Sequence, residues 1–229
     1  MTDHARDLEA VREATDRLLS ATDKMDHGAV AEPSRLPGWS RGHVLAHLSR
    51  NADALLNVLQ GRPMYANSET RDADIERGAH RPPAEQLSDL RASGAAFLAA
   101  AEAPADWSRR VTLRNGVTDS ASRVPFRRLA EVELHHVDLG VGYELEDLPE
   151  EFVIRENDFL AERFAGHRDV VPTTAVTADG HLWTTGGGAD GDPVTVRGTA
   201  PDILGWLSGR RDGSALTVTG GSLPALPPL

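Results

Sequence analysis

The sequence has 229 residues, a formal net charge of −11 at pH 7 and no cysteine. A chain of this length can form one large domain or two small ones with a buried core. The acidic balance argues against nucleic acids and anionic membranes as partners, because both require a basic surface. The lack of cysteine excludes disulfide bonds, thiolate zinc sites and a cysteine nucleophile.

The hydropathy pattern indicates neither a membrane span nor an export signal. No run approaches the roughly 18 apolar residues that a transmembrane helix requires. The acidic first residues, Met1 to Asp7, lack the apolar segment of a signal peptide. We therefore expect a cytoplasmic protein.

The first 170 residues are predicted to be mostly helical. Apolar residues recur there at three- and four-residue spacing, which is typical of amphipathic helices. The predicted helices are residues 7–25, residues 40–61, a segment after Pro82-Pro83, a segment from about Pro125 and residues 152–164. Ser40 is a good N-cap for the second helix. Four or five such helices suggest a bundle, whose interior can hold a metal between facing side chains.

After Pro172 the pattern changes to the alternation of β-strands. The predicted strands are residues 174–178, 181–185, 193–197 and 216–219. Asp179-Gly180 predicts a hairpin turn between the first two, and Thr199 is a candidate N-cap for a helix that ends at Gly209. We therefore expect a helical domain over residues 1–170 and a small α+β domain over residues 171–229.

Two carboxylate–histidine pairs share one predicted helix. When each residue advances about 100° around the axis, Glu131, His135 and Asp138 fall together beside the apolar stripe. His136 points elsewhere. The pair Glu133 and His136 also has workable spacing, and helical geometry alone leaves that alternative open.

A distant histidine, His47, lies at the edge of the apolar stripe of the predicted helix 40–61. Two helices that offer imidazole and carboxylate groups can build a three-ligand metal site. Such a site leaves one coordination position open, as catalytic zinc does. Each residue also has a simpler interpretation, as a hydrogen-bonded or solvated helix side chain.

Three stretches of the sequence carry a resemblance to a known family. They are Pro37-Gly38-Trp39-Ser40 with His43-Val44-Leu45-Ala46-His47-Leu48, then residues Arg128 to Leu139, and Trp206-Leu207-Ser208-Gly209-Arg210-Arg211 with Leu216 to Gly220. With these motifs the chain resembles, over nearly its whole length, the mycothiol-dependent maleylpyruvate isomerase family. That family belongs to the DinB-like superfamily of metal-binding helical proteins.

The resemblance implies a zinc site inside a DinB-like four-helix N-terminal domain. The implied ligands are His47, Glu131 and His135. The C-terminal domain would contribute a catalytic arginine, which we match to Arg210, with the neighbouring Arg211 as the alternative. Asp138 has no ligand role in the family pattern and is either a partner that orients a ligand histidine or a structural ion pair. Other divalent ions are also compatible with a site of two nitrogens and one oxygen.

The resemblance also implies a reaction. An external low-molecular-weight thiol, mycothiol, would supply the nucleophile, and zinc would deprotonate it. The thiolate would add to the double bond of maleylpyruvate, and rotation followed by thiol expulsion would give fumarylpyruvate. Two alternatives stay open: a metal-dependent mycothiol S-transferase in detoxification or secondary metabolism, and a non-catalytic module that binds thiol or metal.

A small electrophilic acid requires cationic anchors, which arginine provides in bidentate form. Arg210 is the main candidate, and Arg50 and Arg128 are further ones. Arg109-Arg110 and Arg114-Asn115 lie in a loop that contains glycine, from which they would approach the glycan part of the thiol.

Overall fold

A computed structural model describes residues 3–103 and 105–228. It divides the chain into two compact units on either side of the bond between Tyr143 and Glu144. The first unit is helical apart from one small hairpin, and the second combines helices with a sheet.

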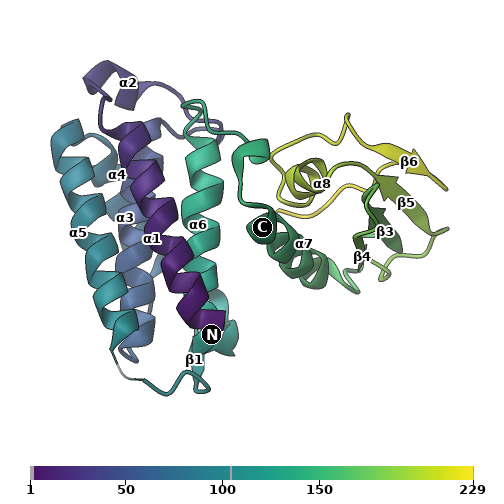
Figure 1. The fold of residues 1–229 in the computed structure, drawn as a ribbon, viewed down its shortest axis with the longest axis horizontal. Helices are drawn as coiled ribbons and strands as arrows, with labels where there is room; N and C mark the ends of the chain where they lie inside the picture. Colours follow the sequence, from purple (N-terminus) through teal and green to yellow (C-terminus); the bar gives the residue numbers. More distant parts are fainter. Residues whose placement is uncertain (1–2, 104, 229) are drawn as a thin grey trace. The chain divides into compact units, whose positions relative to one another are not determined.

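Four long helices form the core of the first unit (Figure 1). They are α1 (Asp3–Thr22), α3 (Arg41–Leu59), α5 (Pro83–Glu102) and α6 (Val124–Asp138). Helix α6 packs against α1 and α3, and α5 also packs against α1 and α3, so the four close into a bundle. Ser40 caps α3 as predicted, because its hydroxyl accepts a hydrogen bond from the His43 N–H group. The four-helix prediction is confirmed.

Two short helices and a hairpin in this unit were not predicted. They are α2 (His27–Ala31), α4 (Ser68–Ala79), and the antiparallel pair β1 (Arg110–Thr112) and β2 (Thr118–Ser120). Helix α4 lies against α3, where a side chain at Gly78 would meet Ala46 at 2.8 Å. Glycine at that position lets the two helices approach closely. The hairpin turns at Asn115 and Gly116, whose φ angles of 58° and 74° match a type I′ turn.

The second unit contains two helices and a four-stranded sheet. The helices are α7 (Glu150–Phe164) and α8 (Ala200–Leu207), and the strands are β3 (Thr173–Val176), β4 (Leu182–Thr185), β5 (Val194–Arg197) and β6 (Thr217–Thr219). The strand order is β4-β3-β5-β6, with β3 and β5 parallel and the other pairs antiparallel. The predicted strands, the hairpin at Gly180 and the helix after Thr199 are all present.

Helix α7 belongs to the second unit, whereas the sequence placed it in the first. It packs against α8 and β4, and the Trp183 indole N–H on β4 donates a 2.7 Å hydrogen bond to Asp158 on α7. Its apolar face, which includes the buried Phe164, therefore completes the core of the sheet domain. The domain boundary lies near residue 143 rather than residue 170, because the hydrophobic pattern identifies a helix without showing which core it joins.

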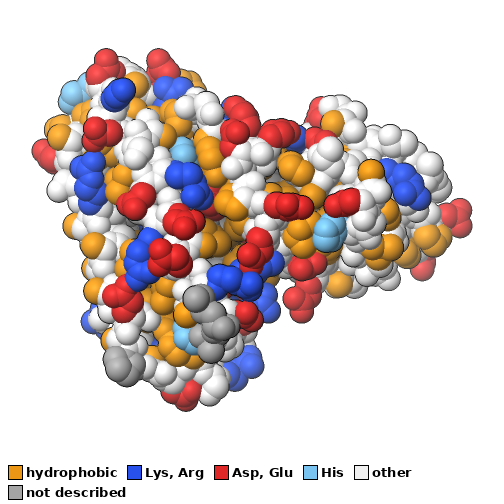
Figure 2. Space-filling model, in the orientation of Figure 1, with side chains coloured by type: hydrophobic (Ala, Val, Ile, Leu, Met, Phe, Trp, Pro, Cys, Tyr) orange, Lys and Arg blue, Asp and Glu red, His pale blue; other side chains and the backbone are white. Residues whose placement is uncertain are grey.

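Charged side chains of both signs cover the visible face of the bundle (Figure 2). The apolar residues of its helices are turned inward, with Leu18, Leu48, Leu90 and Val132 fully buried. Among the described helices, none combines the length and the apolar character that crossing a membrane requires. The bundle therefore has an ordinary apolar core, and polar groups inside it are exceptions that require partners.

Candidate metal centre

Three side chains meet where α3 packs against α6. His47 is on α3, and Glu131 and His135 lie one turn apart on α6. The Nε2 atom of His47 is 2.9 Å from Oε2 of Glu131, and Nε2 of His135 is 3.3 Å from the same oxygen. One ligand atom from each residue lies within 4.8 Å of the other two. A single cation could therefore contact all three residues.

The three side chains differ in their exposure. The side chains of His47 and His135 are 8% and 15% exposed, whereas that of Glu131 is 34% exposed. The carboxylate is therefore the most accessible of the three groups, and the two imidazoles are largely covered. A metal held by these three ligands would keep a coordination position for an outside ligand, as a catalytic metal does.

The protonation states also suit a cation. Burial opposes the charge on Glu131, but hydrogen bonds from His135 and His47 hold its pKa well below the usual value. Burial lowers the pKa of His47, although the hydrogen bond to Glu131 acts in the opposite direction, and the lower pKa favours the neutral imidazole that a metal ligand requires. Burial would also lower the pKa of His135, but hydrogen bonds to Asp138 and Glu131 raise it. A divalent ion would take the place of the proton that His135 shares with the carboxylate.

Asp138 fixes the orientation of His135. Its Oδ2 atom lies 2.8 Å from Nδ1 of the imidazole, so Nδ1 carries a proton and Nε2 is the nitrogen that faces Glu131. Metal-binding histidines commonly have such a carboxylate on the second ring nitrogen. Of the two roles considered for Asp138, the geometry favours the orienting partner.

Replacing Asp138 with asparagine is expected to lower metal affinity about 10- to 100-fold. The substitution preserves the size of this buried side chain but removes the charge that supports the His135 N–H group. Competition against a coloured chelator measures the affinity, with thermal unfolding as a check on folding. Unchanged affinity would show that Asp138 only stabilises the helix.

His47 is held differently. Its Nδ1 atom is 3.3 Å from Nη2 of Arg71 on α4, and arginine can only donate. In the metal-free protein Nδ1 therefore accepts, and Nε2 donates to Glu131. A cation at Nε2 would require the proton to move to Nδ1 and Arg71 to give up this contact.

The alternative pair, Glu133 and His136, lies on another side of α6. Glu133 accepts hydrogen bonds from Arg17 at 2.5 Å and from the Tyr143 hydroxyl at 2.9 Å. His136 is buried and stacks on the Tyr143 ring, with 4.0 Å between centroids. Both residues thus belong to contacts among α1, α6 and the segment after α6, as helical facing predicted for His136.

The arginine candidates have distinct environments. Arg50 pairs with Asp53 and Asp89, and Arg128 is buried and donates to Asn51 and to a backbone carbonyl of α3. Burial lowers the pKa of Arg128 to about 10. Neither arginine is placed as an accessible anchor for a substrate.

Arg210 and Arg211 follow α8. Arg211 forms ion pairs with Asp202 at 2.6 Å and with Glu146 at 2.7 Å. Arg210 donates from Nη1 to the Ser208 carbonyl at 3.4 Å. Arg211 is thus held by two carboxylates of its own domain, and Arg210 stays the arginine that we predict to act on a substrate.

Two residues near the centre were missed in the sequence, Arg71 and Tyr65. The Arg71 guanidinium lies 5.9 Å from the centre of the Tyr65 ring and contacts His47. Helix α4, which carries Arg71, buries only Ile75, Gly78 and Ala79, so it has no apolar stripe to reveal it. The sequence did offer one signal for the start of this helix, the N-cap residue Asn67. Its side chain accepts a hydrogen bond from the Thr70 N–H group.

A second cluster, His43, Glu76 and His80, also has metal-ligand spacing. His43 Nδ1 accepts the Ser40 backbone N–H as part of the α3 cap, which leaves the proton on Nε2, 3.1 Å from Glu76. His80 is 2.9 Å from the other oxygen of Glu76. Glu76 and His80 are exposed, and the hydrogen bonds among the three side chains explain their proximity without a metal.

Comparisons with known proteins identify the same two parts of the chain. Residues 11–140 match the family model described as the mycothiol maleylpyruvate isomerase N-terminal domain, and residues 147–228 match the MDMPI C-terminal domain. Two similar crystal structures are those of the mycothiol-dependent maleylpyruvate isomerase and of a histidine-to-alanine mutant of it. Each has a TM-score of 0.89 and 25% sequence identity, covering 99% of this chain and 97% of that chain. No curated protein matches the sequence.

Proposed function

The chain belongs to the mycothiol maleylpyruvate isomerase family, and we propose that it is a zinc- and mycothiol-dependent cis–trans isomerase. Its substrate would be maleylpyruvate or a related cis-enedioate, and the product of maleylpyruvate would be fumarylpyruvate. The observation that carries the proposal is the cluster of His47, Glu131 and His135, whose ligand atoms are already assembled within reach of a single cation. A module that only retained the fold would be expected to have lost one of these ligands.

The chemistry follows from the residues that would hold the metal. A divalent ion bound there would lower the pKa of a coordinated thiol, so that a thiolate forms near neutral pH. Reversible addition of that thiolate to the cis double bond leaves a single bond, about which the substrate can rotate before the thiol departs. The protein has no cysteine to compete for the substrate.

Two further residues would each perform one task. Asp138 keeps His135 oriented, so this imidazole does not have to turn when a ligand enters. Arg210 would supply a guanidinium to the substrate carboxylate, or to the negative charge that develops on the substrate oxygen during addition. The acid would thereby be held on an otherwise acidic protein.

The test is an assay with purified protein, zinc, mycothiol and maleylpyruvate, in which the product isomer is identified by NMR. We expect fumarylpyruvate to form only when both thiol and metal are present, and without net consumption of the thiol. Omission of either component is the control. If a stable thioether accumulates instead, the protein is an S-transferase; if neither product forms, the isomerase proposal is wrong.

A further inference from the structure

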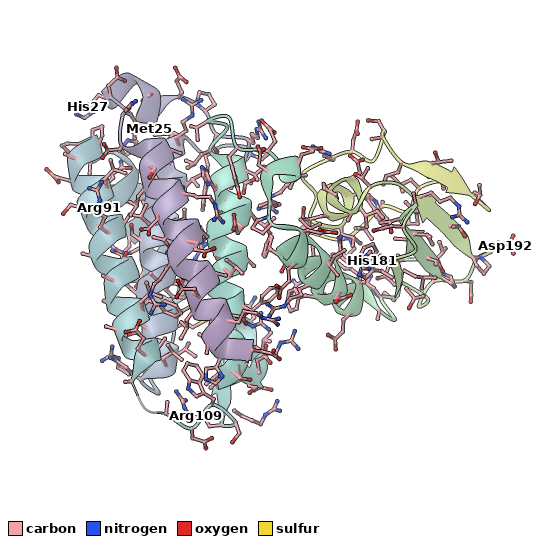
Figure 3. All side chains as sticks on the ribbon, viewed as in Figure 1. Met25, His27, Arg91, Arg109, His181 and Asp192 are labelled. Carbon is pink, nitrogen blue, oxygen red and sulfur yellow. The ribbon has the colours of Figure 1, made fainter. Side chains whose placement is uncertain are left out.

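A cavity of about 520 Å³ lies at one end of the bundle, between the end of α3, the segment that leads into α4, and β1. Its volume is that of a small-molecule site. The arginines that line it are Arg62, Arg71, Arg109, Arg110 and Arg114. Figure 3 shows Arg109 at this end of the bundle. The cavity is therefore basic, although the chain has a net charge of −11.

Most of these arginines lack a carboxylate partner. Arg62 donates to the Asn57 side-chain oxygen, Arg109 to the Leu59 carbonyl and Arg110 to Thr118 across the hairpin. Within residues 3–103 and 105–228, no ion pair with Asp or Glu involves Arg62, Arg109, Arg110 or Arg114. By contrast, arginines elsewhere on the bundle are paired, such as Arg77 with Asp74 and Arg91 with Asp23.

Four unpaired guanidinium groups around one cavity repel one another, and a bound anion would relieve that repulsion. Guanidinium groups bind carboxylates in a fixed two-pronged geometry, which gives both affinity and orientation. Val111 and Leu113 also line the cavity and are buried. Their apolar surface lowers the local dielectric constant and strengthens charge interactions there.

The cavity borders the metal centre. Arg71 lines it and also contacts His47. Tyr65 lines it as well, and its phenol lies within electrostatic range of both Glu131 and Arg114. Arg71 also pairs with Asp72 at 2.7 Å, and its other guanidinium nitrogen, Nη2, would be released from His47 when a cation binds that imidazole.

We propose that this cavity binds the carboxylate of the acidic substrate beside the metal centre. The inference rests on the proposed function only in identifying the anion with the substrate of the isomerase. The arginines around the cavity thereby select electrophiles that carry a carboxylate. The uncharged, hydroxyl-rich part of the thiol is not what the cavity recognises.

The test measures binding of succinate, an unreactive dicarboxylate, to the zinc-loaded full-length chain by titration calorimetry. We expect binding that weakens with added salt, and about tenfold weaker binding in the double variant Arg110→Gln/Arg114→Gln, because charge-assisted hydrogen bonds are lost. The matched control is Arg77→Gln/Arg91→Gln, which removes the same charge from paired, exposed positions. Arg91 lies far from Arg109 along the bundle (Figure 3), and the control should bind succinate like the wild type.

Dimethyl succinate and myo-inositol are the uncharged comparisons, and neither should compete with succinate. Repeating the titration with the His135→Ala variant separates the cavity from the metal, since succinate should still bind. Absence of binding, equal binding by all variants, or equally tight binding of an uncharged ligand would overturn the inference. If succinate binds as expected but no thiol-dependent isomerisation occurs, the carboxylate-binding cavity is supported and only the proposed reaction is wrong.

Discussion

Replacing His135 with alanine is expected to remove most of the bound metal from the purified protein. The change deletes one of two imidazole ligands and leaves only His47 and Glu131 facing each other. Affinity should fall more than about 100-fold, because losing even an outer hydrogen-bonding partner of a ligand costs about 10- to 100-fold. Metal analysis after gel filtration gives the stoichiometry, which should drop from near one per chain. Thiol-dependent activity should fall with it.

The matched control is alanine at the neighbouring His136. That residue is buried against Tyr143, so its replacement should lower the melting temperature by leaving a cavity. It should nevertheless leave the metal content unchanged. Full metal retention in the His135 variant, with loss in the His136 variant, would move the centre to the Glu133 side of the helix.

Much of the fold was predictable because local signals and tertiary packing agree. Ser40 caps α3 where a good N-cap precedes an apolar repeat, and Gly180 turns the hairpin between β3 and β4 with a φ of +96°. Thr199 starts α8 by accepting from Asp202 N–H. Each of these residues specifies its conformation through its own side chain or lack of one.

The elements that were missed lack such agreement or were misread. Helix α4 buries little apolar surface, so periodicity could not reveal it. Asn115-Gly116 is a strong hairpin signal, but the strands on either side are only three residues long and do not show clear alternation. The pairing of α7 with the sheet depends on long-range contacts, such as that of Trp183 with Asp158, which no local pattern encodes.

The candidate site shows the same division. Helical facing separated His135 from His136, because both positions follow from one helix axis. Helical facing could not decide whether Glu133 is a ligand, because the partners of Glu133, Arg17 and Tyr143, come from other segments of the chain. The contact of Arg71 with His47 could likewise not be predicted, because it depends on the position of α4 against α3.

Replacing Arg210 with alanine is expected to lower kcat/KM about 10²- to 10³-fold, which is the usual cost of removing one donor to developing negative charge. Metal content and melting temperature should remain those of the wild type. The reason is that Arg210 is proposed to act on the substrate, whereas the metal is held by residues of the helical domain. Steady-state kinetics with mycothiol and maleylpyruvate provide the measurement, and a lysine variant should recover only part of the activity, because it lacks the two-pronged donor geometry.

The neighbouring Arg211 provides the contrast. It bridges Asp202 at the start of α8 and Glu146 before α7, and its aliphatic stem lies against Gly205, where an added side chain would meet it at 2.8 Å. Alanine at this position should therefore destabilise the C-terminal domain by about 1 kcal/mol, measured by urea unfolding, and affect activity less than the Arg210 change. If the Arg211 variant is instead stable and inactive while the Arg210 variant retains activity, the catalytic arginine is the one that the two carboxylates hold, and these carboxylates would then orient it toward the substrate.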